Sequence, residues 1–443
     1  MNLFLNIPTF KGLVPFPLFF LCITYSIAGF VADPPFYAQT YVGDTIPLPR
    51  QLEVDPFGDI IVSTRDQTSK IFLLYEIPNN GSVEVVQLLL LDAPNSKFGH
   101  GIAYHSGLLY VSNSTHILRW PYTPGARVPL QFDDGVVVVG GIPGEGIPGV
   151  AHFTRTMVFD AEGRLYVSIG SGTDLDDGFV PDRAVIKRFS NLSQVPINYQ
   201  DGEIFATGAR NEVGLTFDPL NRLWGVENSA NLLNRTDLGN NTWIGNPAEE
   251  LNLFDGEVGS HYGYPHCFST YDLPGWTPNT QLLFDPFLDN DSVYNDAWCG
   301  NVTNNRPPAL ALPAHTAPLE LKFYQDRVNC GISGAFPCSM IYSVFATFHS
   351  GSFLGQPTPL GNRVGLIRFN TLTMMPTGQI DETIVYEEHL DSNNACVPDC
   401  FRPVGLAFDT KGHLLVSTDY GNKIIKVTYG QPPPPISKWT IKE

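Results

Sequence analysis

Positive charge is scarce in this chain. Lys and Arg together number 26 against 44 Asp and Glu, which gives a formal net charge of −18 at pH 7. A chain of this sign is repelled by phosphate backbones and by anionic lipid headgroups. The composition therefore argues against nucleic acid and against a membrane surface as partners.

Cysteine is also sparse, and no Cys-x-x-Cys pair or flanking His pair is present, which makes a zinc site a weak interpretation. Apart from Cys22 near the N-terminus, an even set of six remains for disulfides: Cys267, Cys299, Cys330, Cys338, Cys396 and Cys400. Close spacing suggests the pairs Cys330–Cys338 and Cys396–Cys400, with Cys267 and Cys299 left over. Spacing alone does not fix this connectivity.

Long apolar runs are absent except at the N-terminus, where residues 13–31 follow the single cation Lys11. This pattern predicts a secretory signal peptide over residues 1–32, with cleavage after Ala28 or Ala32. A membrane anchor is the rival interpretation, and two prolines inside the run disfavour it. Glycosylation sequons agree with a secreted, extracellular protein, and they begin at Asn80, Asn113, Asn191, Asn234, Asn240, Asn290 and Asn301.

Helical spacing of apolar residues is missing, and a short hairpin pattern recurs in its place. In one copy the polar tip Arg210-Asn211-Glu212 leads into an apolar run, a turn at Asp218-Pro219 and a second apolar run. The copies cover residues 50–63, 100–112, 155–168, 210–226, 315–346 and 402–417. Such a repeat predicts an all-β, six-bladed β-propeller over residues 33–430, with long inserted loops between the later blades.

The spacing of the copies supports this count. The first four copies lie about 50 residues apart. A seventh blade between residues 230 and 310 is the alternative, although no second hairpin is visible there. We expect residues 36–42 to complete the last blade, which removes an exposed sheet edge. We expect residues 431–443 to be a Pro-rich tail with nothing folded after the prolines.

A cation or an imidazole stands at or near the start of every copy. The set consists of Arg50, His100, His152, Arg155, Arg210, His315, His349 and Arg402. A single Arg at a strand start is usually a surface charge or a salt bridge between blades. Propeller symmetry, however, would bring all of these side chains to one axis, and like charges in one place cost energy unless an anion sits among them. The recurrence therefore predicts a polyanionic ligand at the axis.

Several motifs carry a resemblance to a known family. They are Pro49-Arg-Gln-Leu, Gly99-His-Gly-Ile-Ala-Tyr, the run from Arg155 to Ser168, Gly208-Ala-Arg-Asn-Glu-Val-Gly-Leu, Asn246-Pro-Ala-Glu-Glu-Leu-Asn, His261-Tyr-Gly-Tyr-Pro, Ala314-His-Thr-Ala-Pro and Arg402-Pro-Val-Gly-Leu-Ala-Phe-Asp. Over residues 40–430 the chain resembles the soluble glucose/sorbosone dehydrogenase family, and within it the fungal pyrroloquinoline-quinone-dependent pyranose dehydrogenases.

The resemblance implies a secreted enzyme that oxidises a pyranose or keto-sugar by hydride transfer to pyrroloquinoline quinone, with calcium. It also implies an external electron acceptor, such as a cytochrome, a quinone or a copper oxygenase. The cofactor carries three carboxylates, so it matches the polyanion that the ring of cations predicts.

Site roles follow from the same resemblance, position by position. His152 matches the general base, and Arg210 with Asn211 matches the pair beside the quinone carbonyls, which makes His152 and Arg210 the catalytic candidates. The expected cofactor-binding residues are Arg50, His100, Arg155, Arg210, Asn211, His315, His349 and Arg402, of which His349 and Arg402 match groups on the cofactor's carboxylates.

The expected calcium ligands are the main-chain carbonyls of Ser229 and Ala230 for the catalytic ion. Glu250 and Tyr262 match a structural calcium site. Ser229 stands where relatives have Gly, and Asn231 stands where they have Asp. The aspartates between residues 174 and 182 lack the spacing of a calcium-binding helix–loop–helix, and we expect a solvated turn there.

Two other functions remain open on the sequence. One is a calcium-dependent propeller hydrolase or lactonase, which would require acidic and Asn side chains around one axial ion. The other is a non-catalytic binding propeller. The fold alone does not choose among the three.

Overall fold

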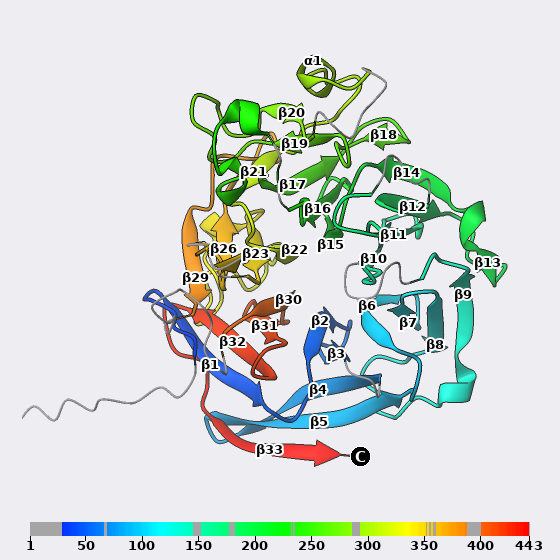
Figure 1. Cartoon of the computed structure of the whole chain (residues 1–443). Helices are drawn as coiled ribbons and strands as arrows, with labels where there is room; N and C mark the ends of the chain where they lie inside the picture. Colours follow the sequence, from blue (N-terminus) through cyan, green and yellow to red (C-terminus); the bar gives the residue numbers. More distant parts are fainter. Residues whose placement is uncertain are drawn as a thin grey trace, which may run out of the picture.

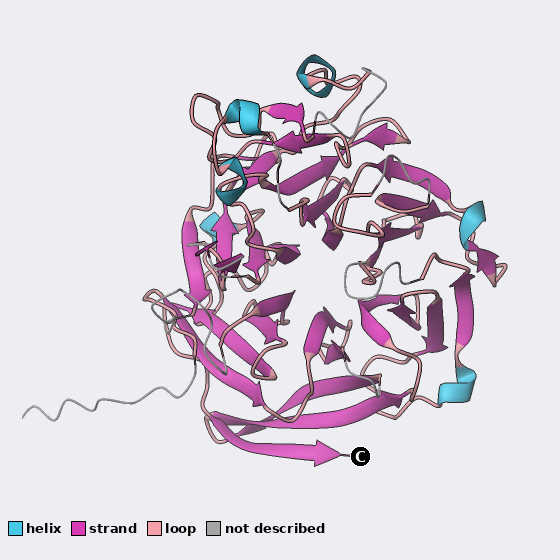
Figure 2. Ribbon diagram, in the orientation of Figure 1, coloured by secondary structure: helices cyan, strands magenta, loops and turns pink. Residues whose placement is uncertain are grey.

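The computed structural model describes residues 29–65, 69–144, 152–176, 182–231, 233, 235–285, 293–350, 352–353, 356–357, 360–387 and 400–442. In this part of the chain, six sheets of four or five strands surround a common centre (Figure 1). Strands and loops make up nearly all of the ring, with little helix (Figure 2). The prediction of a six-bladed β-propeller is therefore confirmed. Most of the expected signal peptide, Cys396, and the sequons at Asn234 and Asn290 lie outside the described residues.

The sheets follow one another along the chain. The first three, each starting from its innermost strand, contain β2 (Pro49–Val54), β3 (Ile60–Thr64), β4 (Lys70–Asn79), β5 (Ser82–Asp92) and β33 (Ile436–Lys442); β6 (Phe98–His105), β7 (Leu108–Asn113), β8 (Ile117–Pro121), β9 (Val136–Gly140) and β13 (Ile197–Asn198); and β10 (Met157–Phe159), β11 (Leu165–Ile169), β12 (Val185–Phe189), β14 (Glu203–Thr207) and β18 (Ser260–His261). The last three contain β15 (Glu212–Phe217), β16 (Leu223–Glu227), β17 (Glu249–Phe254) and β21 (Leu310–Leu312); β22 (Pro318–Phe323), β23 (Val344–Phe348), β26 (Arg363–Ile367) and β29 (Glu382–Tyr386); and β30 (Pro403–Phe408), β31 (Leu414–Thr418), β32 (Lys423–Tyr429) and β1 (Phe36–Gly43).

The first two strands of each sheet are the hairpins that the sequence predicts, and an aspartate organises the turn in four of them. In the first hairpin, Oδ1 of Asp55 accepts hydrogen bonds from the N–H groups of Phe57, Gly58 and Asp59 at 2.8 to 2.9 Å. Gly58 has φ +98°, a conformation that glycine adopts without strain. The corresponding carboxylates of Asp160, Asp218 and Asp409 cap their turns in the same way. The recurring Asp therefore explains why the hairpin repeats so faithfully.

The core is divided into apolar layers between neighbouring sheets. Between the first two sheets, for example, Ile61 and Leu73 pack with Ile102, Val111 and Trp120, all of which are fully buried. Burial of this kind on both faces accounts for the continuous apolar runs in the inner strands.

The ring closes through both termini. Strand β1 pairs antiparallel with β32, so residues 36–43 complete the last sheet as the sequence predicts. The expectation that nothing folded follows the proline run is wrong. Strand β33 pairs in parallel with β5 at the outer edge of the first sheet, and the indole N–H of Trp439 donates to the carbonyl oxygen of Tyr41. Alternation of polar and apolar residues over 436–442 is the signal that the Pro-rich composition concealed.

The chain between residues 230 and 310 adds no seventh blade within its described residues. It supplies β17 and β21 to the fourth sheet and β18 to the third. Outside the blades lie the pair β19 (Cys267–Ser269) and β20 (Gln281–Leu283) and the short helix α1 (Asp296–Cys299), besides the small pairs β24 (Ser352–Phe353) with β25 (Gln356–Pro357) and β27 (Phe369–Asn370) with β28 (Met375–Pro376) in the fifth region.

Disulfides staple these later insertions. Cys267 is bonded to Cys299 and Cys330 to Cys338, as expected, and Cys400 is also disulfide-bonded. The described residues contain no helix with the length and apolar character needed to cross a lipid bilayer.

Candidate active site

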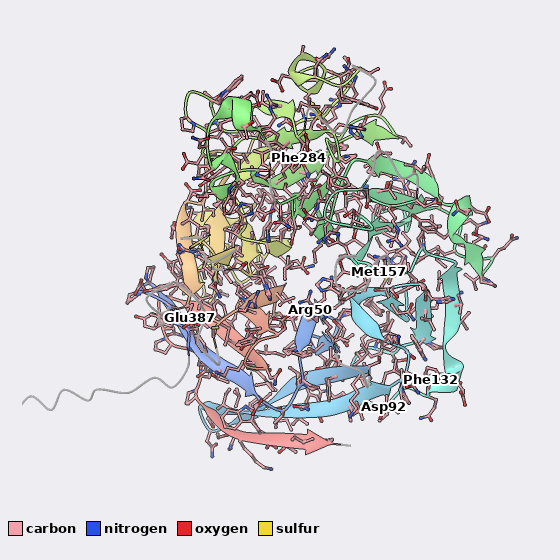
Figure 3. All side chains as sticks on the ribbon, in the orientation of Figure 1. Arg50, Asp92, Phe132, Met157, Phe284 and Glu387 are labelled. Carbon is pink, nitrogen blue, oxygen red and sulfur yellow. A yellow bond between two sulfur atoms is a disulfide. The ribbon has the colours of Figure 1, made fainter. Side chains whose placement is uncertain are left out.

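The innermost strands β2, β6, β10, β15, β22 and β30 contact one another around the axis, and the predicted ring residues lie at or just before their first residues. Figure 3 shows Arg50 close to the centre of the ring. A buried serine from the preceding hairpin fixes several of these positions. Ser63 Oγ donates to the carbonyl oxygen of His100 at 2.6 Å, and Ser112 Oγ donates to that of Arg155 at 2.7 Å. Ser417 donates to the carbonyl oxygen of Arg50, so the repeated serine ties each blade to the start of the next.

Glycine at the start of the inner strands permits this close approach. A Cβ atom on Gly101 would lie 2.2 Å from the carbonyl oxygen of Arg155, and one on Gly405 would lie 2.3 Å from that of Arg50. No side chain fits at either position, so the recurring Gly has a packing cause.

The first of two polar clusters at the axis is centred on Asp419. Its Oδ2 accepts from Nη1 of Arg50 at 2.7 Å, and its Oδ1 accepts from Nε2 of His349 at 2.9 Å. Arg402 in turn donates from Nη2 to Nδ1 of His349 at 3.0 Å. Burial alone would raise the pKa of Asp419, but His349 and Arg50 hold it well below its ordinary value. Asp419 is therefore a resident counter-charge for these cations, and the structure brings Arg50, His349 and Arg402 together as predicted.

His100 lies beside this cluster and is completely buried. Neither of its ring nitrogens has a hydrogen-bond partner within the described residues, and the same is true of the buried Nε of Arg50. Burial, with the Arg50 guanidinium next in importance, lowers the pKa of His100 well below its usual range. These unpaired polar atoms are costly inside a protein and leave hydrogen-bonding capacity unused at the axis.

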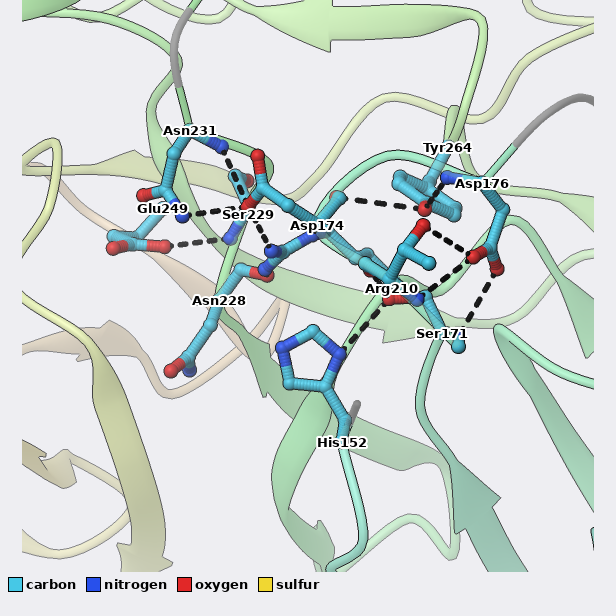
Figure 4. Close-up of polar contacts among 12 residues, drawn as sticks. His152, Ser171, Asp174, Asp176, Arg210, Asn228, Ser229, Asn231, Glu249 and Tyr264 are labelled. Atoms are coloured by element: carbon cyan, nitrogen blue, oxygen red, sulfur yellow. Dashed lines mark hydrogen bonds and ion pairs between the residues drawn. The ribbon is translucent and has the colours of Figure 1, made fainter. Parts of the chain in front are cut away.

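The second cluster is centred on Arg210 and Asp174 (Figure 4). The Arg210 guanidinium donates to the carbonyl oxygen of Asp174 at 2.8 Å, to its Oδ1 at 2.6 Å and to the carbonyl oxygen of Asn228 at 2.6 Å. Asn231 donates from Nδ2 to the same Oδ1 at 2.6 Å. An aspartate at position 231 would repel Asp174, which explains why Asn at this position is compatible with the pair. The expectation of a solvated turn is wrong for Asp174 and for Asp176, which is buried and accepts from the N–H groups of Gly172 and Thr173.

His152 borders the second cluster, and its Nδ1 lies 2.9 Å from Oγ of Ser171 (Figure 4). Its backbone N–H donates to the carbonyl oxygen of Ser171 at 3.2 Å, while the backbone N–H of Ser171 donates to that of Arg210 at 2.8 Å. Gly170 makes room for the ring, because a Cβ there would lie 2.5 Å from Cβ of His152. Burial and the Arg210 guanidinium lower the pKa of His152 to about 3, so its imidazole is neutral at ordinary pH.

Arg155 is a correction to the expected set of ligand-binding residues. It is fully buried, and its guanidinium donates to the carbonyl oxygens of Ser114, Pro143, His152 and Thr154. A side chain bonded in this way supports the segment that carries His152 and does not reach a ligand. His315 has a less direct place than predicted, since its Nε2 donates to the carbonyl oxygen of Trp243 at 2.6 Å.

The four predicted calcium ligands line a single small cavity. Ser229, Ala230, Glu250 and Tyr262 surround it together with Glu227. Residues Glu212, Glu227 and Glu250 lie opposite one another on β15, β16 and β17, and burial raises the pKa of Glu250 to about 7. Among the described residues, however, no group of three His, Cys, Asp or Glu side chains is already arranged as a metal site.

Comparison with known proteins identifies the family. A family model described as TrAA12-like matches residues 31–430. The chain belongs to the TrAA12-like family.

Relatives of this TrAA12-like chain agree with that assignment. It is 27% identical over 399 residues to a pyrroloquinoline quinone-dependent sugar dehydrogenase of Hypocrea jecorina, covering 85% of this chain and 84% of the relative. It is 29% identical over 408 residues to a pyrroloquinoline quinone-dependent pyranose dehydrogenase of Coprinopsis cinerea, covering 85% of this chain. The chain spans about half the length of that relative, since the match covers 52% of it.

Solved structures show the same fold as this TrAA12-like chain. A Trichoderma reesei structure of the carbohydrate-active enzyme family AA12 matches with a TM-score of 0.74 at 24% identity, over 90% of this chain and 97% of that one. The holo form of the pyranose dehydrogenase PQQ domain from Coprinopsis cinerea matches with a TM-score of 0.72 at 23% identity, over 90% and 97%.

Three residues of the TrAA12-like site were missed by sequence reasoning. Asp419, Asp174 and Ser171 all stand one to six residues after an inner hairpin, outside the repeated positions that drew attention to the cations. The signal that could have found Asp419 is electrostatic. A ring of buried Arg and His needs counter-charges, and acidic residues next to the hairpin ends are the nearest candidates.

Proposed function

We propose that this protein is a quinoprotein that oxidises a pyranose or a related keto-sugar with pyrroloquinoline quinone bound at the centre of the propeller. The observation that carries the proposal is the gathering of Arg50, His349 and Arg402 at the axis of a strongly acidic chain. The names of the relatives from Hypocrea jecorina and Coprinopsis cinerea support it, because both are pyrroloquinoline quinone-dependent enzymes.

The residues at the axis fit such an anionic cofactor. Asp419 balances only part of the positive charge of its cluster, and the buried Nε of Arg50 and both ring nitrogens of His100 have no partner within the described residues. A guanidinium binds a carboxylate through paired hydrogen bonds, so Arg402 and Arg50 would hold the carboxylates of the cofactor, with His349 beside them. Pyrroloquinoline quinone, when bound, supplies an ortho-quinone that accepts two electrons from the sugar carbon.

The second cluster would perform the proton chemistry and the electrostatic stabilisation. His152 is neutral and would accept the hydroxyl proton of the sugar as the carbon is oxidised. Arg210, held in place by Asp174 and Asn228, would stabilise negative charge that develops on oxygen, with Asn211 beside it. A cation that is already fixed does this without reorganising during the reaction.

Calcium would bind at the cavity that Ser229, Ala230, Glu250 and Tyr262 line. Oxygen donors suit this ion, and buried carboxyls with raised pKa values are energetically relieved by a divalent cation. We further propose export, glycosylation and an external electron acceptor, which rest on the N-terminal apolar run and the sequons.

A titration tests this function. Pyrroloquinoline quinone and Ca²⁺ are added to purified apoprotein, and cofactor absorbance is followed together with dye reduction by several sugars. Binding at micromolar cofactor and sugar-dependent reduction are expected. No binding at that concentration would reject the proposal, while binding without turnover on any sugar would favour a non-catalytic propeller. A hydrolase is disfavoured already, because the axial side chains are mainly Arg and His.

A further inference from the structure

The hydroxyl group of Ser171 has two close neighbours, and they impose different roles on it. One is Nδ1 of His152 at 2.9 Å, and the other is the carbonyl oxygen of Thr173 at 2.6 Å. The side chain of Ser171 is fully buried, so water does not compete for either contact. Figure 4 shows the His152 ring meeting Ser171 from the side opposite to the Asp174 loop.

Counting protons settles the direction of both bonds. A carbonyl oxygen can only accept, so the single hydroxyl proton of Ser171 points to Thr173. The oxygen of Ser171 then has only lone pairs left for His152, and Nδ1 must be the donor. The backbone carbonyl oxygen of Ser171 lies on the same side of the ring and also favours a proton on Nδ1.

We propose that Ser171 is a positioning residue that holds His152 in the Nδ1–H tautomer and leaves Nε2 as a bare lone pair facing the axis. Neutral imidazole can accept a proton at only one nitrogen, and Ser171 selects which one. No hydrogen bond to Nε2 occurs within the described residues, so this nitrogen is available to an incoming hydroxyl group.

His349 provides an internal contrast. Its Nδ1 faces the guanidinium of Arg402, which can only donate, so the proton of a neutral His349 lies on Nε2 and is donated to Asp419. The two axial histidines thus carry opposite tautomers. His349 presents a donor to a carboxylate, while His152 presents an acceptor, as a base requires.

The tautomer can be measured without any assumption about activity. In the full-length apoprotein labelled with ¹⁵N-histidine, two-bond ¹⁵N–¹H spectra at pH 7 distinguish Nδ1–H from Nε2–H, and His152→Gln assigns the signals. We expect Nδ1–H for His152 and Nε2–H for His349. Ser171→Ala should increase the Nε2–H population of His152 and leave His349 unchanged. An Nε2–H signal for wild-type His152, or no change in Ser171→Ala, would overturn the inference.

A second readout rests on the proposed function. In Ser171→Asp a carboxylate would accept the Nδ1 proton and favour the imidazolium, so the acid limb of kcat/KM should move up by about one pH unit or more. The other charged groups that act on the ring are the guanidiniums of Arg155, Arg183 and Arg210, which the substitution leaves in place. An acid limb that does not move would contradict the role of Ser171.

The two measurements separate the possible failures. If the ¹⁵N spectra show Nδ1–H but the protein binds no cofactor, the proposed function is rejected and the positioning by Ser171 stands. If the protein turns over sugar but His152 carries its proton on Nε2, the positioning by Ser171 is rejected and the proposed function stands.

Discussion

Asp419 joins Arg50 through a 2.7 Å ion pair in which both side chains are largely shielded from water. Arg50 opens the first inner strand, whereas Asp419 follows the last hairpin of the ring, so the pair connects the two blades where the propeller closes. The same carboxylate holds His349 of the fifth sheet. One acidic side chain therefore orders three of the cationic or imidazole positions at the axis.

Asp419→Ala should destabilise the apoprotein by about 3 to 5 kcal/mol, because it leaves the buried Arg50 without a counter-charge. Urea unfolding at pH 7 measures the change. The matched control is Glu203→Ala, which removes the partner of Arg188 in a more exposed pair. A loss no larger than that of the control would contradict the role assigned to Asp419.

Gly101→Ala should cost about 3 kcal/mol or prevent folding, because its Cβ would lie 2.2 Å from the carbonyl oxygen of Arg155. Gly378→Ala is the control, since no atom lies within 4 Å of the Cβ position there. Thermal unfolding of both variants measures the difference. Equal stability would mean that the inner strands are packed less closely than the structure shows.

Stability should also fall as the pH rises through the acidic range, because several glutamates are buried. Burial raises the pKa of Glu320 to about 7 from an ordinary value near 4.5, so the folded state binds the proton more tightly than the unfolded state. The stabilisation is present below pH 4.5 and is lost as the pH rises towards 7. Glu320→Gln should therefore be more stable than wild type by about 1 to 3 kcal/mol at pH 8, with little difference at pH 4.5.

Unfolding free energies at these two pH values test the claim. Asp419 provides an opposite comparison within the wild-type chain, because its pKa is depressed and its contribution is lost only at low pH. A Glu320→Gln variant with the same pH dependence as wild type would show that Glu320 is ionised in the folded protein at no cost.

The fold was largely predictable, because its hairpins repeat the same local physics. The turns at Asp55, Asp160, Asp218 and Asp409 use one capping geometry, and short-range hydrogen bonds of this kind are written in adjacent residues. Strand β33 was missed because its partner β5 is far away in the chain, and the prolines before it are typical of linkers.

The cationic half of the candidate site was predictable from recurrence, but the direction of each side chain was not. Arg155 and Arg50 stand at equivalent places in the sequence, yet Arg155 bonds to backbone carbonyls while Arg50 pairs with Asp419. The difference depends on what the neighbouring loops offer, which is a tertiary property. The carboxylates Asp174 and Asp419 do not recur in the repeat, so only the assembled ring reveals them.

The two polar clusters should fail in different ways when each loses one side chain. His152→Ala removes the proposed base and should lower kcat by about 10² to 10⁴-fold, while affinity for pyrroloquinoline quinone stays close to that of wild type. Arg402→Ala removes a charge-assisted contact to a cofactor carboxylate and should weaken cofactor binding by about 10 to 100-fold. Cofactor titration by absorbance, followed by dye reduction at saturating cofactor, separates the two effects. Equal loss of affinity and turnover in His152→Ala would show that the imidazole binds the cofactor and is not the base, whereas unchanged affinity in Arg402→Ala would remove the cluster around Asp419 from the cofactor site.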